Sequence, residues 1–246
     1  MPRSSSVQEA ATFDRAWLAA ERGPTPHHLG HRERLRARAA AAPGALPDYE
    51  LLELLLFRSL PQGDVKPLAK ALLDRFGGLA GVLSARPEEL RTVKGVGPSV
   101  ALDLRLLHEA TLRIGRGEVA ARPVITSWSA LVAYTKTALA HEAREQFRVL
   151  FLDKKNQLIV DETMNEGTVD HAPVYPREVM RRALELSASA VILVHNHPSG
   201  DPTPSAADID MTRQVVEAGR ALKIAVYDHL VVGRAGVASF KALGLM

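Results

Sequence analysis

The stretch VILVHNHPSGDPTPSAADID, residues 191–210, determines how the second half of the chain is interpreted. Its apolar start predicts a buried strand that ends at two histidines separated by one residue. Residues two apart on a strand project to the same side, so His195 and His197 are expected to project together while Asn196 points the other way. The Pro/Gly-rich segment after them predicts a turn, and Ser205 predicts the N-cap of the next helix.

Two imidazoles on one face at the end of a sheet can bind one metal ion. A catalytic zinc typically keeps three protein ligands and an open position for water. Asp208 is the best candidate for the third ligand, because the turn doubles the chain back and Asp208 falls in the first turn of the next helix. Asp201, inside the turn, and Asp210, about 200° around the helix from Asp208, are the alternative carboxylates.

The composition describes a globular protein whose 246 residues, 46% of them hydrophobic, fit two domains. Cysteine is absent, which excludes disulfides and thiolate metal sites and leaves histidine and carboxylate ligands. We expect a cytoplasmic protein, because a reducing compartment suits this composition. No apolar run approaches the ~18 residues that a membrane span needs, and the N-terminus has no apolar core of a signal peptide.

The net charge of +3 is uneven along the chain. Residues 1–121 hold 17 Lys and Arg against 14 Asp and Glu, whereas residues 122–246 hold 14 of each. The whole excess therefore lies in the first half, and it is a weak indication of a polyanionic partner.

The pattern of apolar residues and breakers divides the chain into four parts. Residues 1–30 are typical of a disordered tail, and residues 31–114 predict an all-α domain of about five short helices. Residues 115–124 have the composition of a linker. From residue 125 to residue 246, predicted strands alternate with helices, which indicates an α/β or α+β domain.

The segment ELRTVKGVGPSVA contains a glycine-rich turn between two predicted helices. Gly95 and Gly97 permit positive φ or a close backbone approach, and the N–H groups that open the next helix favour an anion. Lys94 and Arg91 lie where they can contact phosphates. The segment resembles the helix-hairpin-helix motif, which holds a nucleic-acid phosphate without reading bases. A plain helical hairpin or a protein-binding module are the alternatives.

Several motifs resemble one family of metalloproteins. His-Xaa-His-Pro, six residues, then Ser-Xaa-Xaa-Asp resembles the JAMM motif of JAB/MPN domains. HNHPSG, PSAADIDMT, GTVDHAPVYPRE and DHLVVG are similar to the RadC-like branch of that fold, and GHRERLR, DYELLELLLF and the GVG hairpin are similar to its N-terminal region. The resemblance covers about residues 28–240. It implies a small all-α helix-hairpin-helix domain followed by an α/β domain of JAB/MPN, cytidine-deaminase-like type.

The resemblance also implies roles for individual residues. Zn²⁺ would be bound by His195, His197 and Asp208. Ser205 would stabilise a developing oxyanion, with a helix N-cap as the simpler alternative. A glutamate upstream of the histidines would act as general base, and Glu145, just before a predicted strand, fits best.

The sequence leaves the identity of the general base and the role of one further histidine open. Glu142, Glu162, Glu166 and Glu178 are the alternative bases, and without any of them near the metal the protein would bind zinc without hydrolysing a substrate. The Asp228-His229 pair includes a histidine that either orients a metal ligand or belongs to the core.

These observations favour a zinc-dependent hydrolase that cleaves amide or isopeptide bonds. A metal-dependent nuclease or other phosphodiesterase is the second interpretation, and a non-catalytic scaffold that binds DNA or a partner is the third. The expected partners are DNA, through the helical domain, and a protein or peptide substrate. No membrane partner and no particular oligomeric state are indicated.

Overall fold

The computed structural model describes residues 27–121, 123–166 and 174–246. The chain divides into two compact units, Met1–Ala71 and Leu72–Met246. Residues 1–26, which make up most of the predicted tail, lie outside the described residues. The first described helix, α2, already begins at His27, inside the predicted tail.

The first unit is helical. It contains α2 (His27–Ala41), the short 3-10 helix η1 (Pro43–Ala45), α3 (Asp48–Ser59) and the start of α4 (Lys66–Phe76). Leu35 of α2 and Leu52 and Leu56 of α3 are buried and form its apolar core. Pro47 occupies the N-cap position of α3 in an extended conformation, and Asp48 is the first helical residue. Its carboxylate there complements the positive end of the helix dipole.

The second unit opens with the end of α4, followed by α5 (Leu79–Ser84), α6 (Pro87–Leu90) and the long helix α7 (Pro98–Ala120). Because α7 continues to Ala120, the prediction of a linker is wrong for residues 115–120. The side chain of Val119 is fully buried in the core beneath the sheet, and Arg116 donates a hydrogen bond to the Tyr134 hydroxyl at 3.2 Å. These contacts stabilise the end of α7, where Gly115 and Gly117 would disfavour a helix in isolation.

A five-stranded sheet follows, in the order β2-β1-β3-β4-β5. Strands β3 and β4 are parallel, and the other neighbouring pairs are antiparallel. The elements after α7 are η2 (Val124–Ser127), α8 (Trp128–Leu139), β1 (Gln146–Leu152), β2 (Leu158–Glu166), α9 (Pro176–Glu185), β3 (Ala190–Asn196), α10 (Ala206–Leu222), β4 (Ala225–Gly233) and β5 (Gly236–Ser239). The predicted mixed α/β domain is therefore confirmed.

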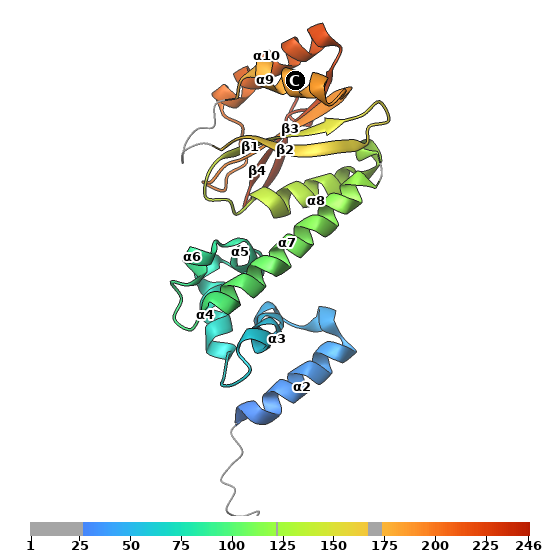
Figure 1. The fold of residues 1–246 in the computed structure, drawn as a ribbon. Coiled ribbons are helices and arrows are strands. Elements are labelled where there is room, and N and C mark those ends of the chain that lie inside the picture. Colours follow the sequence, from blue (N-terminus) through green and yellow to red (C-terminus); the bar gives the residue numbers. More distant parts are fainter. Residues whose placement is uncertain (1–26, 122, 167–173) are drawn as a thin grey trace, which may run out of the picture. The chain divides into compact units, whose positions relative to one another are not determined.

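Helices cover both faces of this sheet, with α8 on one face and α9 and α10 on the other (Figure 1). Strand β3 is buried at every position, as expected for a central strand covered on both sides. Ile192 and Val194 pack in the core on the α8 side, and Val191 and Leu193 pack in the core on the α9 and α10 side. Since side chains alternate along a strand, residue 195 follows onto the α10 face and residue 196 onto the α8 face.

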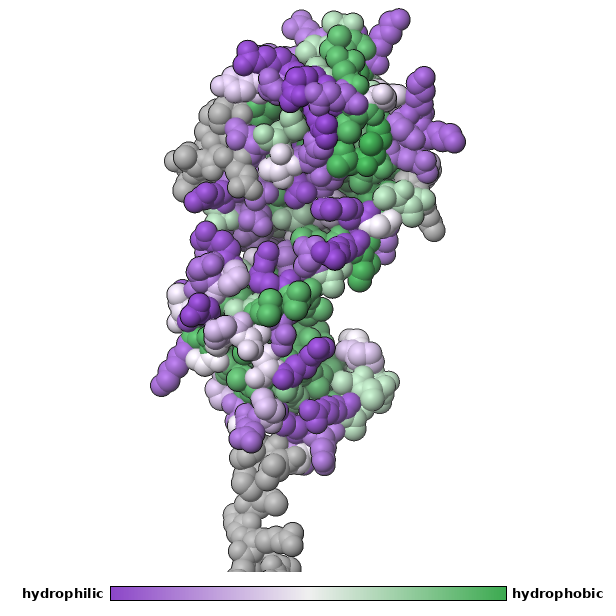
Figure 2. Space-filling model, in the orientation of Figure 1, coloured by the Kyte–Doolittle hydropathy of each residue, from purple (hydrophilic) through white to green (hydrophobic). Residues whose placement is uncertain are grey.

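Hydrophilic side chains cover much of the face drawn in Figure 2, and apolar residues gather in separate patches among them. The large hydrophobic residues that α7 exposes are Leu102, Leu106 and Ile114. Among the described residues, every helix is too short or too polar to cross a membrane.

Candidate metal centre

The two histidines lie at the carboxyl end of the central strand. His195 is only 1% exposed. His197 directly follows the strand, and its backbone N–H donates to the carbonyl of Val232 in β4 at 2.9 Å. This bond extends the strand pairing by one residue, so both imidazoles leave the same face of the sheet, as predicted.

The turn after the histidines is tied to the hairpin between β4 and β5. Arg234 donates to the carbonyls of Pro198 and Ser199, at 2.9 and 2.7 Å. Gly200 has φ +94°, which favours glycine. A Cβ on Gly233 would lie 2.3 Å from the Gly200 carbonyl oxygen, so this close approach also requires glycine.

A capping box at the start of α10 fixes the third candidate ligand. The Ser205 hydroxyl accepts from the backbone N–H of Asp208 at 3.2 Å, and the Ser205 N–H donates to Asp208 Oδ2 at 2.7 Å. The predicted N-cap is therefore present. The alternative carboxylates are engaged elsewhere, since Asp201 bonds to Thr203 and Asp210 accepts from Gln214.

Three ligand atoms converge between β3 and α10. The two Nε2 atoms of His195 and His197 are 3.0 Å apart. Asp208 places Oδ1 3.3 Å from His195 Nε2 and Oδ2 3.4 Å from His197 Nε2. In the described part of the chain, this is the one group of three such side chains whose ligand atoms all lie within 4.8 Å of one another.

A chain of buried hydrogen bonds fixes the tautomer of His195. The Thr212 hydroxyl donates its single proton to the carbonyl of Asp208 at 2.6 Å, so it must accept from Nδ1 of His229, also at 2.6 Å. Burial holds the pKa of His229 well below its ordinary value, so this ring is neutral and its Nε2 is an acceptor. His195 therefore donates from Nδ1 to His229, at 2.7 Å, and when it is neutral it presents the lone pair of Nε2 to the cluster.

His197 is oriented in the same way by the backbone. Its Nδ1 lies 2.9 Å from the carbonyl oxygen of Asp201, which can only accept a hydrogen bond. When neutral, His197 also turns the lone pair of Nε2 toward the cluster. Such outer contacts are typical of metal-binding histidines.

This donor set fits a zinc-sized cation. Two lone pairs and a carboxylate repel one another at 3.0–3.4 Å unless a positive charge lies between them. Ligand bonds of about 2.0–2.1 Å in a tetrahedral zinc site separate the ligand atoms by about 3.4 Å. The observed spacing is close to that value, and the side of the cluster that faces the cleft leaves room for a fourth ligand.

Charge coupling within the cluster is strong even without a cation. Burial alone would raise the pKa of Asp208, but hydrogen bonds with His195, His197 and Ser205 hold that pKa well below its usual range. The hydrogen bond with Asp208 raises the pKa of His197, although burial opposes this shift. A proton and a metal ion therefore compete for the same position.

The cluster opens onto a cleft of about 790 Å³, which Glu142 and Glu145 also line. The negative charge of Glu145 contributes to the raised pKa of His197, as expected for a carboxylate on the same cleft. Of the alternative bases, Glu162 is bound to Arg182 and Glu178 to Arg181. The side chain of Glu166 is not among those that the structure describes.

Asn196 positions the segment that carries Glu145. Its side chain is buried on the α8 face, where Nδ2 donates to the carbonyls of Glu142 at 3.4 Å and Arg144 at 3.1 Å. Its Oδ1 accepts from the backbone N–H of Gln146 at 2.8 Å. Sequence reasoning placed Asn196 on the opposite face and gave it no role. The available signal was an amide at a buried strand position, which requires hydrogen-bond partners.

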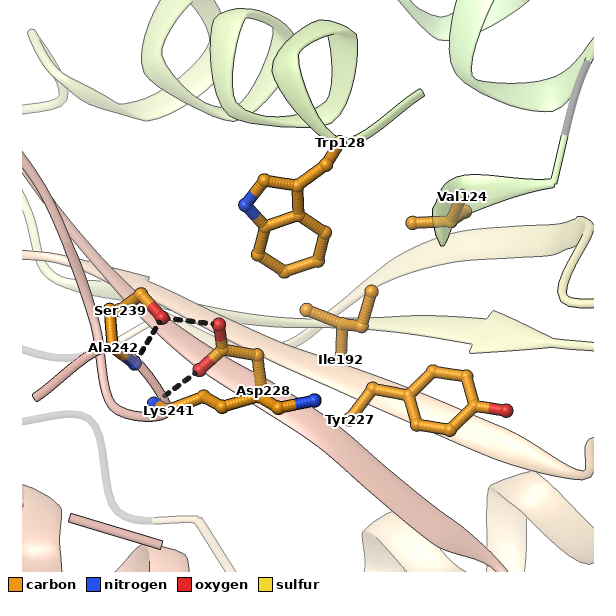
Figure 3. A pocket seen from close by; sticks show the side chains of 8 residues that line it. All are labelled: Val124, Trp128, Ile192, Tyr227, Asp228, Ser239, Lys241 and Ala242. Atoms are coloured by element: carbon orange, nitrogen blue, oxygen red, sulfur yellow. Dashed lines mark hydrogen bonds between the residues drawn. The ribbon is translucent and has the colours of Figure 1, made fainter. Parts of the chain in front are cut away.

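Asp228 lies outside the cluster, although its neighbour His229 hydrogen-bonds with His195. Its carboxylate accepts from the Ser239 hydroxyl and from the backbone N–H groups of Lys241 and His229. Figure 3 shows this carboxylate beside a cavity of about 460 Å³ under Trp128. The hydrogen bonds of His229 with His195 and Thr212 agree with the interpretation of His229 as a residue that orients a metal ligand.

The glycine-rich hairpin has part of the predicted geometry. Gly95 has φ +100°, whereas Gly97 is extended and precedes α7 directly. Arg91 and Lys94 are exposed, and no described carboxylate forms an ion pair with either. The helix before the turn, α6, has only 4 residues. A helix-hairpin-helix motif therefore stays a prediction.

A mixed sheet between two helical layers, with a His-Xaa-His pair at a strand end and an aspartate on the next helix, defines an α/β domain with a candidate metal centre. Residues 125–245 match the family model of the RadC-like JAB domain. Through this domain the chain belongs to the RadC-like JAB family, which confirms the resemblance found in the motifs of its second half.

Proposed function

We propose that this protein is a zinc-dependent hydrolase of JAMM type that cleaves amide or isopeptide bonds. The observation that carries the proposal is the convergence of His195, His197 and Asp208 at 3.0–3.4 Å, on a cleft that also holds Glu145. Membership in a JAB family supports a metal-dependent hydrolase.

The protein groups have separate tasks in this reaction. Zinc, when bound, lowers the pKa of a water molecule to about 7 and polarises a carbonyl. Glu145 takes a proton from the attacking water and delivers it to the leaving nitrogen. Asn196 holds the backbone on both sides of Glu145, which keeps the base at a fixed position over the cleft.

Ser205 is proposed to stabilise the oxyanion. Its hydroxyl donates to Asp208 Oδ2 at 2.7 Å and accepts from the Asp208 N–H. The cap uses only the lone pair, so the hydroxyl proton can rotate to a substrate oxygen while the cap remains. The cap and the catalytic role are therefore compatible.

The charges of the cleft favour a neutral substrate bond over a phosphodiester. Glu145 and Asp208 are both acidic, and they repel a phosphate. Arg234, a cation on the same cleft, donates to two backbone carbonyls. A peptide or isopeptide in the cytoplasm is thus the substrate class that we propose.

The Arg91–Gly97 turn is proposed to contact DNA through phosphates. The support is the positive φ of Gly95 and the exposure of Arg91 and Lys94. Replacing Lys94 with Ala should lower the slope of log affinity against log salt by about one. An unchanged slope would argue against this role.

A cleavage assay with matched variants tests the hydrolase. Zinc-loaded wild type should cleave members of a peptide and isopeptide panel, and Glu145→Gln should lower the rate about 10²–10⁴-fold while zinc stays bound. Glu178→Gln, at an exposed glutamate paired with Arg181, is the control and should keep full activity. Cleavage of an oligonucleotide in place of the peptides, or full activity in Glu145→Gln, would overturn the proposal.

A further inference from the structure

A second cavity, of about 440 Å³, lies among helices α5, α7 and α8. Its walls are largely apolar, with Leu79 and Leu83 from α5, Ala133 from α8 and Ala140 just after α8. The hydroxyl groups of its two threonines, Thr111 and Thr137, donate to carbonyls of their own helices. Most of the surface that this cavity offers a ligand is therefore hydrophobic.

Of the polar side chains that line this cavity, which include Lys136 and His141, that of His108 is the buried one. His108 lines it and is 4% exposed. Within the described ranges, its imidazole makes no hydrogen bond, unlike the buried rings of His195 and His229. Burial lowers the pKa of His108, and the charge of Arg105 acts in the same direction. A neutral ring therefore offers one donor and one acceptor nitrogen to a ligand in the cavity.

The cavity adjoins the metal centre. His141, just after α8, lines both this cavity and the cleft that holds His197 and Asp208. A chain that passes the metal ligands can therefore continue across His141 into the apolar cavity. Within the described residues His141 also makes no hydrogen bond that would close this passage.

We propose that this cavity binds an aromatic side chain of the substrate near the bond to be cleaved, with His108 bonding to the polar tip of that ring. Tyrosine and tryptophan combine an apolar body with one hydrogen-bonding group, and they match largely apolar walls that present one buried imidazole. The inference rests on the proposed hydrolase for its assignment of the occupant as substrate. It assigns a selectivity role to helices that precede the JAB domain.

Binding and cleavage of one peptide set test this proposal separately from the hydrolase. The probes are fluorescein-labelled Gly/Ser peptides in which Tyr, Trp, Phe, Leu or Ala is placed at each position in turn. Binding is measured by anisotropy with zinc-loaded Glu145→Gln protein, and cleavage is measured with the wild type. One register should favour Tyr and Trp over Phe by roughly tenfold, because Phe leaves the imidazole unpaired.

Three variants and one control in the same background locate the selectivity. His108→Leu should remove the preference for Tyr over Phe, and His108→Gln should restore part of it. Ala133→Phe, at an exposed lining position, should lower affinity for all the aromatic peptides by about tenfold. Ala110→Phe, at an exposed position of α7 that does not line the cavity, is the control and should leave binding unchanged.

The outcomes separate the two proposals. Aromatic preference that both His108→Leu and Ala133→Phe reduce, in a protein that cleaves no peptide, supports the cavity and contradicts the hydrolase. Cleavage without an aromatic preference, or with a preference that neither variant changes, overturns the cavity. Failure of every peptide to bind overturns it as well.

Discussion

The two faces of strand β3 serve the candidate site in different ways. On the α10 face, His195 reaches the cluster with His197 and Asp208, and all three ligand atoms come from residues 195–208. On the α8 face, the amide of Asn196 bonds to three backbone groups about 50 residues earlier in the chain. One face is built from a local motif and the other from a long-range contact.

This difference separates metal binding from catalysis. The α10 face, called the ligand face because the metal ligands lie there, depends on a strand, a turn and a capping box that are adjacent in the sequence. The α8 face, called the clamp face because Asn196 holds the segment around Glu145 there, depends on the antiparallel pairing of β1 with β3. This pairing brings Gln146 and Phe147 to the end of the histidine strand. Substitutions on the ligand face should therefore change metal affinity, and substitutions on the clamp face should change the rate of the reaction.

Loss of a ligand should have the largest effect. Asp208→Ala removes the only carboxylate of the cluster, and zinc affinity should fall by more than the roughly 10–100-fold that loss of an outer contact causes. Zinc content after dialysis, measured by elemental analysis, provides the test. Asp210→Ala, two residues further on, should keep a full complement of zinc because Asp210 accepts from Gln214 and is not part of the cluster. Equal zinc content in both variants would remove Asp208 from the ligand set.

On the clamp face, Asn196→Ala should lower kcat by roughly 100-fold, near the lower end of what acid–base catalysis contributes. Zinc affinity should change little, because no ligand atom belongs to Asn196. The variant leaves the N–H of Gln146 without its side-chain acceptor, which costs about 1–3 kcal/mol of stability. Thermal unfolding must therefore be measured beside the kinetics.

A double variant shows whether Asn196 acts through Glu145. If it does, adding Asn196→Ala to Glu145→Gln should lower the rate little further, because both changes remove the same contribution. Independent, multiplicative losses would mean that Asn196 only supports the fold.

The same contrast explains what the sequence could predict. The His-Xaa-His spacing, the turn and Ser205 are local signals, and together they predicted the position of Asp208. The alternation of strands and helices predicted the α/β domain. The extent of α7 could not be predicted, because Gly115 and Gly117 disfavour a helix locally and tertiary burial of Val119 overrides them.

Contacts between residues far apart in the chain were the main feature that the sequence could not predict. Glu145 was one of several candidate bases, and only the pairing of β1 with β3 brings it to the cleft while Glu162 lies with Arg182. Thr212 was missed because its role depends on contact with His229, 17 residues away on another element. No periodicity reports such a contact.

Thr212 allows a finer test of the ligand face. Thr212→Val keeps the shape of the side chain and removes the hydroxyl that accepts from His229. Without that acceptor, the tautomer of His229 and hence of His195 is no longer fixed, and zinc affinity should fall about 10–100-fold. Thr212→Ser should restore most of the affinity. Competition with a chelator measures both, and equal affinities for Val and Ser would show that the relay does not act on the metal.

Proton competition at His197 should have the smallest effect. Zinc binds the neutral ring, and in the metal-free protein the hydrogen bond with Asp208 raises the pKa of His197 above its ordinary 6.5, against the opposing effect of burial. Above that raised pKa, affinity should be independent of this proton. Below it, the protonated ring must lose its proton first, so affinity should fall by about tenfold per pH unit. Because the pKa is raised, the fall should begin above pH 6.5. Affinities measured between about pH 5.5 and 8, corrected for the titration of the chelator, provide the test. A flat profile down to pH 6 would contradict the coupling of His197 to Asp208, and with it the close packing of the ligand face.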